Sequence, residues 1–367
     1  MKLARRLRAV ALVVVICVAL VGAAGAFVYA RVHEPYRGYG GSEQFVDLPA
    51  GAGSRTITDR LVEGGIVSDH LTFRLALWRS GQGRHLKAGE YRFDRTMTPF
   101  EVIDKLVRGD VYVINVTFPE GLTIADMAAI FEAHGFGPRA AFVAAAQDPS
   151  PIRHLDATAT NLEGYLFPET YPLSRHTDAA SLVRLMAARF EHVLTPELRQ
   201  AAAARHVSVH QLVTLASIVE KETARPDERP IVAAVYENRL RIGMPLQCDP
   251  TVIYALQRAG RYDGNLRHDD LAFDSPYNTY RYAGLPPGPI ASPGRASLEA
   301  ALNPATANFL YFVSRNDGSH EFARSLGDHN KNVQKYQVQY FRDRRAGRSG
   351  EAGRARGSGE VGRSGRR

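Results

Sequence analysis

The chain begins with a long apolar segment that no charged residue interrupts. This segment runs from Ala9 to Ala30 and is rich in Val, Ala and Leu. About 20 apolar residues suffice for a helix to cross a bilayer, so residues 9–30 predict a transmembrane helix. The four basic residues in the flank 1–8 favour a cytoplasmic N-terminus, with the rest of the chain on the outer side.

A cleaved signal peptide is the alternative interpretation of this segment. The apolar core of a signal peptide is only about 7–15 residues long and precedes a cleavage site of small residues. The sequence Ala23-Ala24-Gly25-Ala26 resembles such a site, but the apolar run is longer than a typical core and favours an uncleaved anchor. In both cases the body works outside the cytoplasm, which argues against kinases and dehydrogenases that depend on cytosolic cofactors.

Short strand and helix patterns follow in a first α+β module at residues 45–110, after a polar, Gly/Tyr-rich linker at residues 31–44. Thr98 and Glu101 have the spacing of a capping box at the start of its last helix. The patterns predict strands at 45–48 and 89–93 and helices at 57–64, 68–80 and 98–108.

A larger, mostly helical domain with a small β portion is predicted at residues 111–341. Asp249 is expected to cap one of its helices, with Pro250 at the first helical position. Residues 274–293 are rich in Pro, Gly, Tyr and Asn and are expected to form a loop. The other predicted helices are 123–134, 180–193, 208–223, 227–241, 297–302 and 329–341, and the predicted strands are 111–118 and 309–314. The predicted fold class is therefore α+β, preceded by a transmembrane helix.

The net charge of +8 is concentrated at the two ends of the chain. Residues 1–8 carry +4 and residues 342–367 carry +6, so that residues 9–341 have a net charge of −2. A groove for nucleic acid needs clustered cations on the folded part of a protein, so nucleic acid is not expected as a partner. The Gly/Arg/Ser composition of residues 342–367 predicts a disordered basic tail.

The sequence motifs give no indication of a cofactor, a metal ion or a disulfide. Cys17 lies in the apolar run and Cys248 stands alone, so no structural bridge is expected. The chain lacks the glycine patterns of nucleotide-binding loops and the His-Glu-x-x-His and Cys-x-x-Cys motifs of metal sites. Any chemistry is therefore expected to come from ordinary side chains.

The predicted helix 208–223 carries the strongest candidate for acid–base chemistry. Leu212, Leu215 and Val219 form its apolar stripe, and Glu222 extends that stripe in the last turn. Desolvation on such a face and the negative end of the helix dipole both raise the pKa of a carboxyl group. A general acid that works at neutral pH needs such a raised pKa.

Two other interpretations of this helix end stay open on the residues alone. Glu222 could pair with Lys221, Arg225 or Arg229 and only close the helix. Glu220 lies on the other flank of the stripe, and helical spacing does not separate the two glutamates.

Many motifs, in the right order along the chain, resemble the YceG-like family, the endolytic murein transglycosylases. The similarity runs from the anchor to about Tyr340 and leaves out the tail. The matching segments are 163–171 (EGYLFPETY), 215–223 (LASIVEKET), 238–244 (NRLRIGM), 246–254 (LQCDPTVIY), 277–280 (YNTY), 284–290 (GLPPGPI), 303–304 (NP) and 310–313 (LYFV).

This resemblance implies a LysM-like module at residues 45–110 and a lysozyme-like catalytic domain at residues 111–341. In lysozyme-like transglycosylases the catalytic glutamate precedes Ser or Thr near a helix end. That pattern selects Glu222, which Thr223 follows, over Glu220. Cys248 departs from the family pattern, in which Thr is usual at this position.

The resemblance also implies a lyase reaction that one carboxyl group can catalyse. Glu222 would protonate the glycosidic oxygen between MurNAc and GlcNAc and then, as a carboxylate, remove a proton from the MurNAc 6-hydroxyl. That hydroxyl closes on C1 with the advantage of intramolecular attack and leaves a 1,6-anhydro end. The expected place is the outer face of the cytoplasmic (inner) membrane, where cleavage of nascent peptidoglycan would set strand length beside peptidoglycan synthases as partners.

Several further residues are candidates for contacts with sugars. Tyr277, Asn278 and Tyr280 lie in the 274–293 loop and could stack on or hydrogen-bond a glycan, although the same residues also suit turn chemistry. Glu163 and Glu169 flank aromatic residues and could line the cleft, as a second carboxylate, or form ion pairs. The remaining candidates for sugar contacts are Gln247 and Asn238.

Two rival functions remain beside the transglycosylase. A hydrolytic muramidase of the same fold would use water and a second carboxylate. A non-catalytic, membrane-anchored scaffold would bind peptidoglycan without cleaving it.

Overall fold

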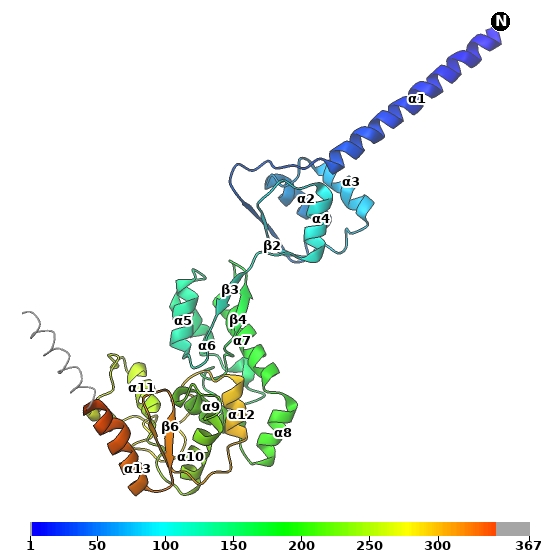
Figure 1. Cartoon of the computed structure of the whole chain (residues 1–367). Coiled ribbons are helices and arrows are strands. Elements are labelled where there is room, and N and C mark those ends of the chain that lie inside the picture. Colours follow the sequence, from blue (N-terminus) through cyan, green and yellow to red (C-terminus); the bar gives the residue numbers. More distant parts are fainter. Residues whose placement is uncertain (1, 343–367) are drawn as a thin grey trace, which may run out of the picture. The chain divides into compact units, whose positions relative to one another are not determined.

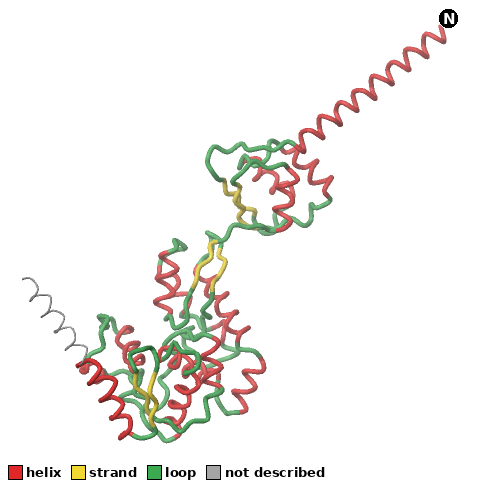
Figure 2. The backbone as a smooth tube through the Cα atoms, in the orientation of Figure 1, coloured by secondary structure: helices red, strands yellow, loops and turns green. Residues whose placement is uncertain are grey.

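The computed structural model describes residues 2–342, which form two compact units. The first unit contains the chain up to Asn115 together with Pro172–Arg175, and the second contains Val116–Tyr171 and the described residues from His176 onward. Figures 1 and 2 show helices and short strands in both units. The predicted mixture of helices and strands is therefore confirmed. The predicted basic tail, apart from Arg342, lies outside the described residues.

The apolar N-terminal segment forms helix α1 (Lys2–His33). Within the described residues, Val10–His33 is the one stretch long and apolar enough to cross a membrane, and most of its large side chains are exposed. The helix continues past the predicted end at Ala30 because its last turn packs on the first unit, where Val32 joins the hydrophobic core.

Residues 31–44, interpreted from the sequence as a linker, pack in part on the first unit. Tyr36 and Met97 exchange backbone hydrogen bonds of 3.0 and 3.3 Å, and the Gly38 N–H donates to the Gly65 carbonyl over 2.8 Å. Helix α1 is thus joined to the rest of the first unit by contacts and not by a free segment.

The first unit packs helices on a two-stranded antiparallel ribbon. Strand β1 (Gln44–Leu48) pairs with β2 (Gly89–Phe93), and Val46 lies opposite Tyr91. The helices are α2 (Ser54–Glu63), α3 (His70–Ser80) and α4 (Pro99–Arg108).

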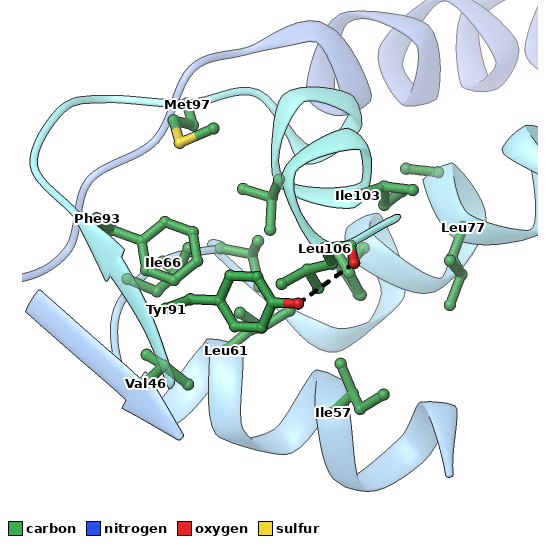
Figure 3. Packing of buried hydrophobic residues seen from close by; sticks show 14 of the residues in the cluster. Val46, Ile57, Leu61, Ile66, Leu77, Tyr91, Phe93, Met97, Ile103 and Leu106 are labelled. Carbon is green, nitrogen blue, oxygen red and sulfur yellow. Dashed lines mark hydrogen bonds between the residues drawn. The ribbon is translucent and has the colours of Figure 1, made fainter. Parts of the chain in front are cut away.

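Apolar side chains from the ribbon and the helices meet in the core of the first unit (Figure 3). Tyr91 is fully buried there, and its hydroxyl donates to the carbonyls of Lys87 (2.8 Å) and Leu106 (3.3 Å). Burial raises the pKa of Tyr91 to about 12, so its hydroxyl stays a donor. The predicted capping box is confirmed, because Thr98 and Glu101 bond each other's backbone N–H groups (3.2 and 2.7 Å).

From Ile114 onward the described chain is mostly helical, as predicted, with two short strand pairs. Strand β3 (Ile114–Thr117) pairs with β4 (Thr170–Leu173), and β5 (Tyr311–Ser314) pairs with β6 (His320–Ala323). The helices are α5 (Ile124–Ala133), α6 (Arg139–Ala146), α7 (Ala179–Val193), α8 (Pro196–Ala204), α9 (Val209–Glu222), α10 (Arg229–Arg241), α11 (Asp249–Arg258), α12 (Arg295–Leu302) and α13 (Leu326–Val333).

The structure differs from the predicted elements in a few places. Helices α6 and α8 and strands β4 and β6 had no counterpart in the prediction, because alanine-rich or four-residue segments show little periodicity. The last helix begins at Leu326, with Ser325 as its cap, and changes to a π-helical turn at Gln334–Gln339. The predicted loop at 274–293 contains neither helix nor strand.

Candidate active site

Helix α9 ends at the residue that the sequence singled out. Ser208 and Gln211 form a capping box at its start, and Leu212, Ala216 and Val219 are buried along its length. Thr223 then takes an extended conformation and stops the helix. Glu222, the last helical residue, is therefore held at the end of a well-anchored helix.

Glu222 faces a pocket of about 290 Å³ in the second unit. The walls come from α9, α10, the start of α11, the 274–293 loop, β5 and α13. The lining residues are Glu222, Tyr236, Arg239, Leu246, Gln247, Asp249, Tyr280, Tyr311, Phe312, Leu326 and His329.

Two protein donors share one oxygen of the Glu222 carboxyl group. The Tyr236 hydroxyl donates to Oε1 over 2.7 Å, and the Cys248 thiol donates to the same atom over 2.9 Å. Burial raises the pKa of Glu222, and these two hydrogen bonds oppose that rise because they stabilise the carboxylate. The net direction is upward, as the sequence predicted.

The basic residues near Glu222 in sequence are engaged elsewhere. Lys221 donates to the Gly121 carbonyl over 3.1 Å, and Arg225 binds Asp227 over 2.7 Å. Arg229 lies 3.5 Å from Glu220. Among residues 2–342 no ion pair engages Glu222, so the interpretation that it only pairs with a neighbouring cation finds no support.

Glu220 has a structural environment that differs from that of Glu222. One of its oxygens accepts the Gly294 N–H, at the start of α12, over 3.0 Å, and the other faces Arg229. It does not line the Glu222 pocket. The structure therefore separates the two glutamates that helical spacing left unresolved.

A polar network fixes the end of α9 against its neighbours. The buried Glu228 carboxylate accepts the His320 N–H (2.9 Å) and the His320 ring Nδ1 (2.6 Å), and its Oε2 also accepts the Thr223 hydroxyl over 3.3 Å. These bonds tie α9, the residue before α10 and β6 together, directly after Glu222. The network thus holds the catalytic candidate in place without contacting it.

Sequence reasoning did not find the two residues that contact Glu222. Tyr236 lies inside α10, where it continues the buried positions Val232 and Ala233, and it looked like an ordinary core residue. Cys248 is a single buried thiol just before α11. Burial raises the pKa of both groups well above their usual values, so both remain protonated donors.

Two of the predicted sugar-contact residues line the same pocket as Glu222. They are Gln247 and Tyr280. Gln247 has a φ of +49°, a left-handed conformation that costs a side chain bearing a Cβ about 1 kcal/mol or more. Its N–H donates to the Thr279 carbonyl over 3.1 Å, which joins it to the loop that carries Tyr280.

Asp249 also lines this pocket, and here the helix-cap prediction is wrong. Asp249 is the first helical residue of α11, its side chain makes no capping bond, and Cys248 occupies the cap position. Its Oδ1 accepts the Tyr280 hydroxyl over 2.6 Å instead. The Asp-Pro pair pointed to a helix start, but the start is displaced by one residue and the carboxylate is turned into the pocket.

The two predicted asparagines support the backbone outside this pocket. The Asn278 amide donates to the carbonyls of Leu271 (2.9 Å) and Phe273 (2.7 Å), which is the turn chemistry weighed as its alternative role. The Asn238 amide donates to the carbonyls of Ala307 (2.8 Å) and Phe309 (3.0 Å). Neither side chain lines the Glu222 pocket.

Glu163 and Tyr277 lie around the other end of α11. Glu163 lines a second pocket of about 360 Å³, where it accepts the Ile124 N–H (3.0 Å) and the Tyr254 hydroxyl (3.1 Å). Burial raises the pKa of Glu163 to about 7. Tyr277 packs against Tyr254, with ring centroids 5.0 Å apart. Glu169 forms the ion pair that was its alternative role, with Arg189.

The chain is similar to known proteins over most of its length. The YceG-like family matches residues 46–335 of the chain. The endolytic murein transglycosylase of Bacillus subtilis is 32% identical over 332 residues, which cover 85% of this chain and 90% of that protein. The corresponding protein of Streptococcus pneumoniae strain D39 is 31% identical over 318 residues, which cover 78% of this chain and 57% of that protein.

A solved structure shows the same relationship. The crystal structure of a yceG-like protein from Listeria monocytogenes is 31% identical in sequence and superposes with a TM-score of 0.55. The match covers 79% of this chain and 98% of that one. The likeness therefore extends over most of the described fold.

Proposed function

Because the chain belongs to the YceG-like family, we propose that it is an endolytic murein transglycosylase, a lyase that cuts the MurNAc–GlcNAc bond of peptidoglycan strands. The observation that carries the proposal is the state of Glu222. Its carboxyl group has a raised pKa, no cationic partner among the described residues, and an open pocket beside it. These are the properties of a group that gives and takes a proton.

The geometry supports both halves of a one-carboxyl mechanism. Protonated Glu222 donates to the glycosidic oxygen as the bond from C1 to that oxygen breaks. The resulting carboxylate is stabilised by the Tyr236 hydroxyl and the Cys248 thiol, and it then removes the proton of the MurNAc 6-hydroxyl. The oxygen of that hydroxyl bonds to C1, which leaves a 1,6-anhydro end and returns Glu222 to its acid form without consuming water.

Asp249 gives one specific reason to keep hydrolysis as a second candidate. It places another carboxylate in the same pocket as Glu222, and a muramidase uses a second carboxylate as nucleophile or base. Glu163 and Glu169, the carboxylates considered from the sequence, are not in this pocket. Asp249 is engaged by the Tyr280 hydroxyl, which favours a positioning role in a transglycosylase.

The masses of the products distinguish these functions. We expect purified sacculi treated with the detergent-solubilised full chain to release muropeptides that end in 1,6-anhydroMurNAc, each one water lighter than its hydrolysed counterpart, as measured by mass spectrometry. Products with reducing MurNAc ends would assign the protein to the muramidases. Binding to sacculi without any release would leave only the non-catalytic scaffold.

The pH dependence of turnover should respond to the Tyr236 hydrogen bond. The acid form of Glu222 starts the reaction, so the rate falls as pH rises through its pKa. Tyr236→Phe removes a donor that stabilises the carboxylate, so the pKa of Glu222 rises further and the alkaline limb of the pH–rate profile moves to higher pH, by about one unit.

Tyr171→Phe is the matched control for this change. Tyr171 is also buried, but its hydroxyl donates to the Phe167 carbonyl, so the same substitution there should leave the alkaline limb in place. If the alkaline limb of the Tyr236→Phe pH–rate profile coincides with that of the wild type, or moves to lower pH, then Tyr236 does not stabilise the Glu222 carboxylate.

The finer features of the protein are proposed on the same basis. We propose α1 as a single-pass anchor in the cytoplasmic membrane, with the N-terminus in the cytoplasm, residues 45–110 as a LysM-like module and residues 111–341 as a lysozyme-like catalytic domain beside peptidoglycan synthases. Gln247 and Tyr280 contact the sugars at the cleaved bond, because they line the Glu222 pocket. Glu163 and Tyr277 contact the strand farther along α11.

A further inference from the structure

One face of helix α3, in the first unit, exposes large apolar side chains. Trp78 is 82% exposed and Leu71 is 68% exposed. With the partly buried Leu75, these residues follow the spacing i, i+4 and i+7, so they form a single stripe on the helix surface. We call Leu71, Leu75 and Trp78 the α3 stripe.

The core of the first unit does not require the α3 stripe. The opposite side of α3 is buried through Phe73, Ala76 and Leu77, which join the hydrophobic cluster of the unit. Single exposed apolar residues are common on protein surfaces. An aligned apolar stripe that includes a highly exposed tryptophan indicates instead a surface that binds a partner.

The α3 stripe begins beside the last turns of α1. A hollow between the two helices is lined by Phe27, Val28, Leu71 and Leu75, among others. The guanidinium of Arg31 lies 3.4 Å from the Asp69 carboxylate, which caps α3. The face of α3 that carries Leu71 and Leu75 is therefore turned toward the last turns of α1.

The length of α1 sets where a bilayer would end along it. About 20 residues cross the hydrocarbon layer, so a span that starts at Val10 ends near Tyr29. Phe27 and Val28 then lie at the boundary between acyl chains and headgroups, and Leu71 lines the same hollow as both. Figure 1 shows α3 starting beside the base of α1 and running across its direction. Trp78 lies about two turns after Leu71 on the same face of α3.

The charge of α3 fits the same surface. The helix carries Arg74 and Arg79 and no acidic residue, and Arg84 follows shortly after it. Arg74 is exposed between Leu71 and Trp78. A helix with an apolar stripe and flanking arginines is suited to the interface of a membrane with anionic headgroups, where tryptophan is enriched.

We propose that the α3 stripe docks on the outer leaflet of the membrane that α1 spans, with Trp78 inserted among the headgroups and Arg74 facing anionic lipid. This proposal rests on the proposed anchoring by α1. Docking gives the first unit a second attachment point beside its anchor, so the unit cannot swing freely about the end of α1 and is held in one orientation on the membrane.

Trp78 is the single tryptophan of the chain and therefore reports on its own surroundings. The full chain is reconstituted into vesicles of phosphatidylcholine and phosphatidylglycerol, and flotation shows whether it is inserted. We expect the emission of Trp78 to lie to the blue of solvent-exposed tryptophan and to be quenched by lipids brominated near the headgroup end of their acyl chains. Replacing phosphatidylglycerol with phosphatidylcholine should weaken the quenching.

A matched pair of variants tests the surface itself. Leu71→Asp should reduce the lipid quenching of Trp78 at least twofold while the chain still floats with the vesicles and melts as the wild type does. Leu185→Asp, which changes another exposed leucine (46% exposed, on α7 of the second unit), should leave the quenching unchanged.

Each other outcome overturns the docking proposal in a recognisable way. If the chain does not float, the anchoring premise fails and docking fails with it, whereas the sacculus digestion described above is unaffected. If the chain floats but Trp78 shows solvent-like emission, the anchor stands and only docking is wrong. A blue shift that depends on protein density, or that appears only with added glycan fragments, would assign the stripe to a second copy or to peptidoglycan.

Discussion

Glu222→Gln is expected to lower the release of 1,6-anhydro muropeptides from sacculi by about 10²–10⁴-fold, the range that one positioned acid–base group contributes. The amide has the shape of the carboxyl group and its oxygen can still accept from Tyr236 and Cys248. It cannot donate a proton to the glycosidic oxygen or take one from the 6-hydroxyl. Turnover, measured by product quantification, should therefore be lost. The fold and the binding to sacculi, the latter measured by pull-down, should persist.

Glu220→Gln is the control for this experiment. It changes the same side chain two residues earlier, and its amide oxygen can still accept the Gly294 N–H. Glu220 does not line the Glu222 pocket, so this variant should keep most of its activity. Equal loss of activity in both folded variants would reopen the choice between the two glutamates, and a fully active Glu222→Gln protein would falsify the mechanism.

Arg239→Met should produce a large loss of stability. Arg239 is buried in α10, and its guanidinium donates to the carbonyls of Leu310 and Leu246, each over 2.6 Å, and more weakly to that of Pro245. Methionine leaves these carbonyls without their donor, which costs about 3 kcal/mol or more in unfolding free energy. The melting temperature of the full chain should fall by about 6–12 °C, as measured by thermal denaturation.

Arg241→Met, on the same helix, is the matched control. Arg241 is exposed, and its guanidinium donates to the Asn238 side chain over 3.2 Å. An exposed change of this kind stays within about 0.5 kcal/mol of wild type. If the two variants have the same melting temperature, then Arg239 does not stabilise the wall of the Glu222 pocket in the way that its contacts indicate.

Local features of the fold could be predicted from the sequence because their signals lie within a few residues. The capping box at Thr98 needs only a hydroxyl and a partner three positions later, and it is present as predicted. The same holds for Glu222, whose place on the apolar stripe and at the helix end predicted its raised pKa. The family resemblance selected Glu222 over Glu220, and in the structure Glu222 lines a pocket whereas Glu220 accepts the Gly294 N–H.

The partners of Glu222 could not be predicted, because they approach from distant parts of the chain. Tyr236 and Cys248 are 14 and 26 residues away in sequence, and only packing of α10 and the start of α11 against α9 brings them to one oxygen. The environments of Asn278 and Asn238 depend in the same way on where backbone carbonyls point. A motif that shows an asparagine does not show whether its amide faces a ligand or a turn.

The thiol of Cys248 is unreactive even though it contacts Glu222. Oxidants and disulfides react with thiolates rather than thiols, and burial together with the neighbouring Glu222 raises the pKa of Cys248 far above its usual value. Each time Glu222 ionises, its negative charge disfavours the thiolate further. A buried sulfhydryl can therefore stay in contact with Glu222 without becoming a target for oxidative damage.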